Sequence, residues 1–314
     1  MRDILDLFTT PAFYAMVLQL ATPLVFATLA ALVSNRAGVL NIGIEGTMVV
    51  SALAAAIAST RFGSAAAGLA AAILAGILAG GFFALCAVRL RTHHILVGIA
   101  TNILAAGLAV FVIYGITGNK SDYPAVAIAS WSVPFLRDIP FLGEIFFENL
   151  HPLVALAAVA VAAVAFLFRR TVLGIRIVAV GKNETAAASV GIPTRRIKTV
   201  ALLIAGGLAG LGGAYLSLGY MSGFNTGMVA GRGFIGIAAE AMGAGHPIGS
   251  ALFAVLFGMV NAFSLTAQTF GSLSIPYELL NTLPYLTTTA GLVIYSIVRL
   301  RKARPRRPRK EKRP

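Results

Sequence analysis

A few polar side chains lie within otherwise apolar stretches of this sequence: Asn41, Glu45, Asn102, Glu240 and Asn261. Ionisable residues are costly inside a bilayer, and where they occur they usually line the path of a substrate or an ion. We therefore take these five as candidate pathway residues. For Glu45 and Glu240 a plainer interpretation stays open, because both lie near the ends of apolar runs, where a carboxylate caps backbone amides.

The motifs of common catalytic, nucleotide-binding and metal sites are absent from the sequence. There is no GxxxxGK[ST] loop, no HExxH, no GxSxG and no pair of carboxylates at catalytic spacing. The histidines lack metal-ligand spacing, and a single cysteine, Cys86, excludes an intrachain disulfide. We expect no catalytic residue, no metal and no cofactor, and hence a chain that is not an enzyme.

The composition is that of a membrane protein. Only 11% of the residues are charged, against about 25% in soluble domains, and apolar runs approach the ~20 residues that cross a bilayer as a helix. This predicts an all-α, polytopic chain with about nine transmembrane helices (8–10), at 12–33, 44–60, 65–88, 94–118, 152–168, 197–218, 230–246, 248–268 and 281–298. Two of these, 44–60 and 230–246, are weak, interrupted by glycine, and carry Glu45 and Glu240. Interrupted helices in corresponding halves indicate a transport path.

The basic residues orient the nine helices. With the N-terminus outside and the C-terminus inside, 20 of the 25 Lys and Arg residues face the cytoplasm, as the positive-inside rule requires. Without the 230–246 helix, the basic loop 169–198 would face outside. Ten basic residues lie in the tail 299–314, which suits anionic membrane lipid better than nucleic acid. We expect a multi-pass protein of the bacterial inner membrane.

The cytoplasmic loop 169–198 contains the signals of one short helix. Asn183 is a good N-cap, Glu184 complements the helix dipole, and Gly191 suits the C′ position before Pro193. A helix of about seven residues is marginal alone in water. It therefore needs a partner to pack against.

Two further features remain open between alternatives. The outer loop 119–151 contains the single tryptophan and several prolines, which fits either a docking surface for an external partner or an interfacial lid. The pairs Gly76xxxGly80 and Gly206xxxGly210 allow close helix contact. For these pairs, packing within the chain is favoured over a dimer interface.

Several motifs together resemble one family. They are SNRAGVLNIGIEGTMVVSALAA (34–55), GIRIVAVGKNETAAASVGIPTRRIK (174–198), GLAGLGGAYLSLG (207–219) and GRGFIGIAAEAMGAGHPIGSALFAVLFG (231–258). They resemble the permease subunits of bacterial ABC importers, in the branch that includes ribose and branched-chain amino-acid permeases. The form NIGIEG looks most like the sub-branch for nucleosides and related simple sugars.

This resemblance implies a fold, partners and a role. The fold would be the BtuC-like type II ABC importer permease fold, formed by a single domain over 1–298 with the basic tail 299–314 outside it. The partners would be two ABC ATPase subunits, which bind the ATP, a second permease that is a paralogue and forms a heterodimer with this chain, and an external substrate-binding protein. The coupling helix that contacts the ATPase would carry Asn183, Glu184, Ala186, Ala187 and Gly191.

Three alternatives stay open from the sequence. Within the same family, the substrate is a branched-chain amino acid or a flavin-type vitamin instead of a nucleoside or ribose-type sugar. From a different class, the chain is an ion-coupled secondary transporter that uses Glu45 and Glu240 as proton sites. The third alternative is a scaffold or channel.

Overall fold

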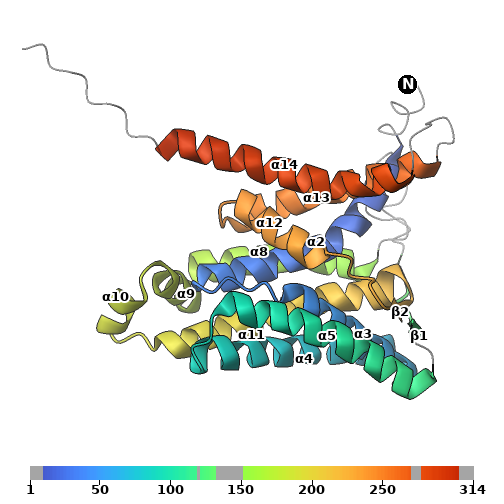
Figure 1. Cartoon of the computed structure of the whole chain (residues 1–314), viewed down its shortest axis with the longest axis horizontal. Coiled ribbons are helices and arrows are strands. Elements are labelled where there is room, and N and C mark those ends of the chain that lie inside the picture. Colours follow the sequence, from blue (N-terminus) through green and yellow to red (C-terminus); the bar gives the residue numbers. More distant parts are fainter. Residues whose placement is uncertain (1–9, 119–120, 132–150, 270–276, 304–314) are drawn as a thin grey trace, which may run out of the picture.

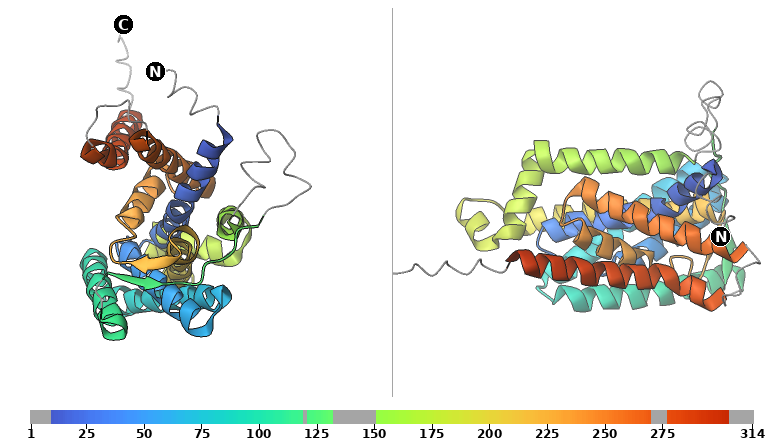
Figure 2. Two further views of the ribbon diagram at one scale, coloured as in Figure 1. Left: turned by 90° about the vertical axis from the view of Figure 1, so that its right-hand side faces the viewer. Right: turned by 90° about the horizontal axis from the view of Figure 1, so that it is seen from above.

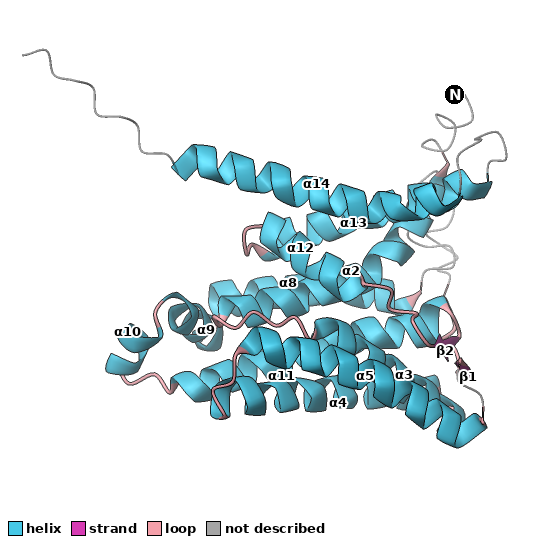
Figure 3. Ribbon diagram, viewed as in Figure 1, coloured by secondary structure: helices cyan, strands magenta, loops and turns pink. Residues whose placement is uncertain are grey.

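The computed structural model describes residues 10–118, 121–131, 151–269 and 277–303. Most of them are helical, and the helices lie side by side along the long axis of the molecule (Figures 1 and 3). Within this described part, six helices are long and apolar enough to cross a membrane. They are α2 (Pro11–Arg36), α4 (Ala65–Ala84) with its π-helical extension η1 (Leu85–Arg89), α5 (His94–Thr117), α8 (Pro152–Arg170), α11 (Thr194–Tyr215) with its π-helical extension η2 (Leu216–Tyr220), and α13 (Pro247–Thr269). The chain is a mostly helical, multi-pass membrane protein, as its hydropathy predicts.

The remaining elements complete the bundle and its two ends. They are α3 (Ile44–Phe62), α9 (Val172–Lys182), α10 (Glu184–Ser189), α12 (Arg232–Met242), α14 (Tyr277–Ala303) and the short strands β1 (Asp122–Pro124) and β2 (Gly223–Asn225). The strands pair antiparallel, with Tyr123 opposite Phe224. This ribbon lies at one end of the bundle, and α9 and α10 lie at the other (Figure 1).

Helix α2 forms the centre of the bundle. It packs against α11, α12 and α13, and its side chains Leu24, Phe26, Leu29 and Leu32 are fully buried. Seen end-on, α13 and α14 lie on one side of the molecule and α4 and α5 on the other (Figure 2). Helices α4 and α5 leave large apolar side chains exposed, among them Leu78 and Phe111, which suits a surface in contact with lipid.

A close helix contact joins α4 to α11 through glycines. A Cβ atom added at Gly76 would overlap the carbonyl oxygen of Gly206, and one added at Gly206 would overlap the carbonyl oxygen of Gly76. Gly80 and Gly210 lie in the same contact, facing Leu202 and Ala72. The two GxxxG pairs therefore pack within one chain, which confirms the favoured interpretation of their spacing.

One predicted membrane helix is shorter than its apolar range. Each of the other eight ranges overlaps a helix, but for 230–246 the structure has the eleven-residue α12. At 1.5 Å per residue α12 measures about 16 Å, roughly half of a ~30 Å hydrocarbon layer. The residues before α12 form turns in which Gly227 and Gly231 have positive φ. This stretch crosses from the ribbon toward α9 as an irregular segment followed by a short helix.

Two other predictions concern segments that lie mostly outside the described residues. Most of the loop 119–151 lies outside them, since only 121–131 and His151 are described. Of the basic tail 299–314, only the residues up to Ala303 are described, as the last turn of α14. Helix α9, by contrast, lies within the described residues and is missing from the predicted elements.

Candidate functional site

The chain between α2 and α3 is not helical. Residues 37–43 leave α2, turn at Gly38, whose φ is +76°, and run back among the helices. A Cβ at Gly38 would lie 3.1 Å from the Cα of Gly181 in α9, so the segment also fits closely against α9. Asn41 is buried, and its Oδ1 accepts the amide hydrogen of Gly43 at 2.9 Å, which closes the turn into α3.

Asn102 of α5 supports the start of α3. Its Oδ1 accepts the amide hydrogen of Gly46 at 2.8 Å, and its Nδ2 donates to the carbonyl oxygen of Ile42 at 3.1 Å. Gly46 lies so close that a Cβ there would be 2.9 Å from the Cα of Asn102. One amide side chain thus serves both a free amide of the helix and the non-helical segment before it.

Glu45, in the first turn of α3, binds the start of α12. Its two carboxylate oxygens accept the amide hydrogens of Gly231 and Gly233, each at 2.7 Å. These amides belong to the first turn of α12, where unpaired N–H groups and the helix dipole favour a negative charge. Glu45 therefore acts as a capping residue for a helix almost 190 residues further along the chain.

Of the two roles that the sequence left open for Glu45, the capping role would serve the amides of its own helix, starting near Thr47. The structure shows the carboxylate bonding amides of α12 instead. Helix α3 begins at Ile44, so Glu45 is already inside it, and a residue inside the first turn no longer occupies the N-cap position that serves the helix's own amides. Asn102 and Thr47 instead bond the first turn of α3, Thr47 through its hydroxyl to the carbonyl oxygen of Gly43.

The opposite end of α12 is held by the end of α2. The side-chain amide of Asn35 donates to the buried carboxylate of Glu240 at 2.9 Å. The guanidinium of Arg36 donates to the carbonyl oxygen of Gly245, through Nε at 2.9 Å and also through Nη2. The segment 35–45 therefore binds α12 at both of its ends, where the helix leaves backbone groups unpaired.

A cavity of about 380 Å³ opens beside the first turn of α12. Its polar lining comes from the side chains of Tyr220, Arg232, Asn261, Ser264, Gln268 and Tyr285. Cavities of this size hold small organic ligands when a few polar groups converge on them. Among the five predicted pathway residues, Asn261 is the one that this cavity includes.

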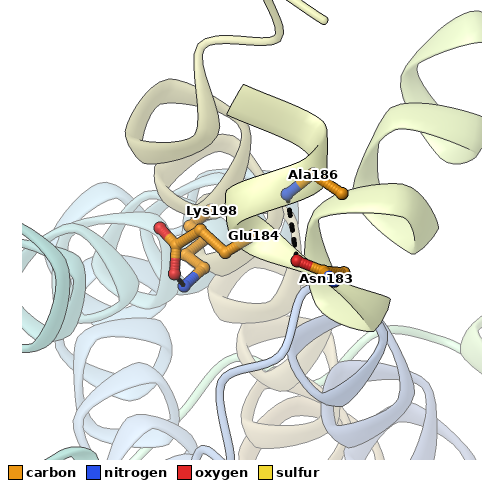
Figure 4. Close-up of polar contacts among 4 residues, drawn as sticks. All are labelled: Asn183, Glu184, Ala186 and Lys198. Atoms are coloured by element: carbon orange, nitrogen blue, oxygen red, sulfur yellow. Dashed lines mark hydrogen bonds and ion pairs between the residues drawn. The ribbon is translucent and has the colours of Figure 1, made fainter. Parts of the chain in front are cut away.

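The short helix predicted in the 169–198 loop is present as α10. Asn183 is its N-cap, and its Oδ1 accepts the amide hydrogen of Ala186 at 2.9 Å (Figure 4). Glu184 forms an ion pair with Lys198 of α11 at 2.5 Å, and this contact holds the pKa of the Glu184 carboxyl below its ordinary value of 4.5. Gly191, with φ of +81°, ends the helix in the left-handed conformation expected of a C′ glycine.

Helix α10 packs only lightly on its own chain. Ala187 is its buried residue, and Ala186 and the side chain of Glu184 are exposed. A helix of six residues with so little buried surface gains little stability from its own packing. The side of α10 turned away from the bundle is therefore available to a partner.

Comparison with known proteins decides the family. The model of the family described as branched-chain amino acid transport system, permease component, matches residues 13–296. The chain belongs to this permease family. The match extends over nearly the whole described bundle, as the four sequence motifs predict, and it favours the ABC permease interpretation over an ion-coupled carrier.

Several curated proteins resemble this permease over most of their length. The nucleoside ABC transporter permease protein NupC of Lactococcus lactis is 32% identical over 283 residues, which cover 88% of this chain and 89% of NupC. The guanosine ABC transporter permease protein NupQ of Bacillus subtilis is 32% identical over 87% of this chain and 88% of NupQ. The putative glucose ABC transporter permease protein TsgC13 of Haloferax volcanii is 31% identical over 91% and 92%. No solved structure matches the permease.

The structure brings three of the five candidate pathway residues together. Asn41, Glu45 and Asn102 all bond within the segment 41–46 or from it to α12. Glu240 lies at the other end of α12, and Asn261 lies across the cavity. Whether these residues act on a substrate remains a prediction.

Arg232 was not predicted as a site residue. In the sequence it counted only as one of the five Lys and Arg residues expected on the outer side of the membrane. Its signal was the pattern Gly231-Arg232-Gly233, a lone cation between two glycines in an apolar stretch. Asn35 and Arg36 were likewise not singled out as partners of α12. Among the described residues, the structure contains no cluster of three or more His, Cys, Asp or Glu side chains that suits a metal.

Proposed function

We propose that this permease is the membrane-spanning subunit of an ATP-driven importer for nucleosides or ribose-type simple sugars. The observation that carries the proposal is the family match over 13–296, together with relatives whose names specify nucleosides, guanosine and glucose. The permease itself performs no covalent chemistry. It provides a path that opens alternately to either side.

The proposed orientation places α9 and α10 in the cytoplasm and the β1–β2 ribbon outside. Arg36, Arg169 and Lys198 lie at the α10 end, in support of the positive-inside rule. The segment 226–242 would then complete one crossing as an irregular stretch plus α12. On this count the chain crosses nine times, with its N-terminus outside and its C-terminus inside, in a type II importer fold located in the inner membrane.

The proposed energy source is a pair of separate ABC ATPase subunits. Helix α10 is the contact we assign to them, through Asn183, Glu184, Ala186, Ala187 and Gly191. Its light packing on the rest of the chain and its firm N-cap support this assignment. ATP binding in the partner would move α10, and the Glu184–Lys198 pair would pass this motion to α11.

The proposed assembly also contains a second, paralogous permease and an external binding protein. In Bacillus subtilis a second protein, the guanosine ABC transporter permease NupP, matches this chain at 30% identity over 82% of its length. In Lactococcus lactis the nucleoside permease NupB, a second protein beside NupC, matches at 27% identity over 77% of this chain. Two different permeases in one organism support a heterodimer here.

The proposed path runs along the junction of α3 and α12. Asn261 would face the substrate directly, since it lines the cavity beside α12. Asn41, Glu45, Asn102 and Glu240 would shape the path through the bonds that hold the two interrupted segments. Segments of this kind occur at membrane depth only where protein or a water-filled path satisfies their backbone.

Uptake in cells tests the proposal. Cells that express the permease with its partners should accumulate labelled nucleoside or ribose, and deletion of the ATPase genes should abolish the uptake. Uptake that survives this deletion but collapses with a protonophore would instead establish an ion-coupled carrier. Flux that needs no binding protein would indicate a channel.

A further inference from the structure

Arg232 lies between two glycines whose backbone amides are both hydrogen-bonded to one carboxylate. The backbone N–H groups on either side of it, those of Gly231 and Gly233, both bond to the carboxylate of Glu45 at 2.7 Å. A Cβ at Gly233 would lie 2.7 Å from the Glu45 backbone nitrogen, so no larger residue fits there. These two hydrogen bonds, called the Glu45 clamp below, fix the backbone from which the Arg232 side chain projects.

The guanidinium of Arg232 is only partly used by the protein. Its Nη1 donates to the carbonyl oxygens of Met228 at 2.8 Å and Val229 at 3.3 Å. The group lies 5.9 Å from the ring centre of Tyr220, within the range of a cation–π contact. Among the described residues, no side chain or carbonyl accepts a hydrogen bond from Nε or Nη2.

The remaining groups of the cavity complement this cation. Asn261 contributes a side-chain amide, and Tyr285 contributes a half-exposed ring whose hydroxyl donates to the carbonyl oxygen of Ala230 at 2.9 Å. The carboxylate of Glu45 accepts the amide hydrogens of the two glycines that flank Arg232. A cavity with one guanidinium, tyrosine rings and uncharged polar side chains suits a ligand that has a flat ring with hydrogen-bond acceptors along its edge.

We propose that this cavity binds a nucleoside in the path and that Arg232 reads its base. A guanidinium donates two parallel hydrogen bonds, and the edge that best accepts them is a carbonyl oxygen beside a ring nitrogen, as at O6 and N7 of guanine. The chemical class is therefore an oxopurine nucleoside, while an adenine edge replaces one acceptor with a donor. This inference rests on the proposed function and extends it to a specificity-determining residue.

The first measurement uses the purified transporter without its binding protein. Thermal unfolding is followed with guanosine, inosine, adenosine, ribose and leucine at equal millimolar concentrations. Guanosine and inosine should raise the melting temperature, and adenosine and ribose should raise it less. Equal shifts for guanosine and adenosine, no shift at all, or a larger shift with ribose or leucine would each overturn the inference.

The second measurement replaces the guanidinium. Arg232→Lys keeps the charge but loses the paired donors. The preference for guanosine over adenosine in apparent affinity should therefore fall about 5- to 150-fold, the range of one bidentate base contact. Arg232→Gln provides a neutral second variant, and Arg61→Gln, at the exposed end of α3, is the matched control. A Lys variant that keeps the wild-type preference would overturn the assignment.

A separate readout distinguishes this inference from the proposed function. ATP-dependent uptake by the wild-type transporter, measured beside the binding experiments, tests the function alone. If the wild-type transporter takes up nucleosides or sugars but Arg232→Lys keeps the wild-type preference for guanosine over adenosine, only the further inference fails. If uptake is absent for every nucleoside and sugar, the proposed function fails with it. If Arg232→Lys weakens capture of the loaded binding protein and leaves base preference unchanged, Arg232 is a docking residue and the inference is wrong.

Discussion

The carboxylate of Glu45 bonds to the backbone amide of Gly233 at 2.7 Å, across 188 positions of the sequence. The same carboxylate bonds to Gly231, so a side chain in the first turn of α3 accepts two amide hydrogens at the start of α12. At the far end of α12, Asn35 bonds to Glu240. The two interrupted segments of the permease are thus one connected unit.

Removal of the Glu45 carboxylate should loosen this unit. Glu45→Ala leaves the amides of Gly231 and Gly233 without their acceptor, and an unsatisfied buried donor costs about 1–3 kcal/mol. We expect Glu45→Ala to lower the melting temperature of the purified transporter and Glu45→Gln, which keeps one acceptor oxygen, to lower it less. A melting temperature for Glu45→Ala equal to that of an exposed-site control such as Arg61→Gln would contradict the clamp.

The glycine contact between α4 and α11 should tolerate no methyl group at its centre. Gly206→Ala places a Cβ against the carbonyl oxygen of Gly76, and forcing the helices apart should cost about 1–3 kcal/mol. Gly207→Ala is the matched control, since its Cβ would lie 3.5 Å from the side chain of Ile77. Thermal unfolding of both variants measures this cost. Equal melting temperatures for Gly206→Ala and Gly207→Ala would show that the contact is not tight.

The N-cap of α10 should matter for coupling. Asn183→Ala removes the acceptor of the Ala186 amide hydrogen, at a cost of about 1 kcal/mol to the helix. We expect weaker association with the ATPase subunits and lower stimulation of ATP hydrolysis by loaded binding protein. Asn183→Ser keeps a capping oxygen and should restore most of both. Equal losses in the Ala and Ser variants would exclude the cap as the cause.

The attachment of α10 to α11 should depend on pH. The hydrogen bond from Lys198 lowers the pKa of Glu184 below 4.5, so the ionised carboxylate is favoured in the folded state. The stability it contributes is present above the ordinary pKa and is lost as the pH falls through the lowered one. Hydrogen-exchange protection of 184–190, corrected for intrinsic rates, should therefore decrease below pH 4.5. Lys198→Met should abolish this dependence, and an unchanged profile in that variant would contradict the role of the pair.

Local signals in the sequence predicted the local structure well. Asn183 and Gly191 marked both ends of α10 because capping depends on neighbours within a few residues. Hydropathy located the helical ranges, since crossing a bilayer requires long apolar runs.

Contacts between distant residues could not be read from the sequence. Nothing near Glu45 indicates that its carboxylate binds amides of α12, since periodicity describes the face of one helix and not its partner. The length of α12 was overestimated because its apolar run continues through turns on either side. Helix α9 was missed because Arg176 and Lys182 among its apolar residues made it similar to a basic loop.

The most direct test of the account is uptake by the transporter reconstituted in proteoliposomes with its ATPase subunits, second permease and binding protein. Labelled nucleoside or ribose should accumulate when ATP and Mg²⁺ are supplied on the ATPase side with loaded binding protein on the other, without any ion gradient. The same vesicles with a non-hydrolysable ATP analogue should show no accumulation. Accumulation that requires a proton or sodium gradient and ignores ATP would contradict the account.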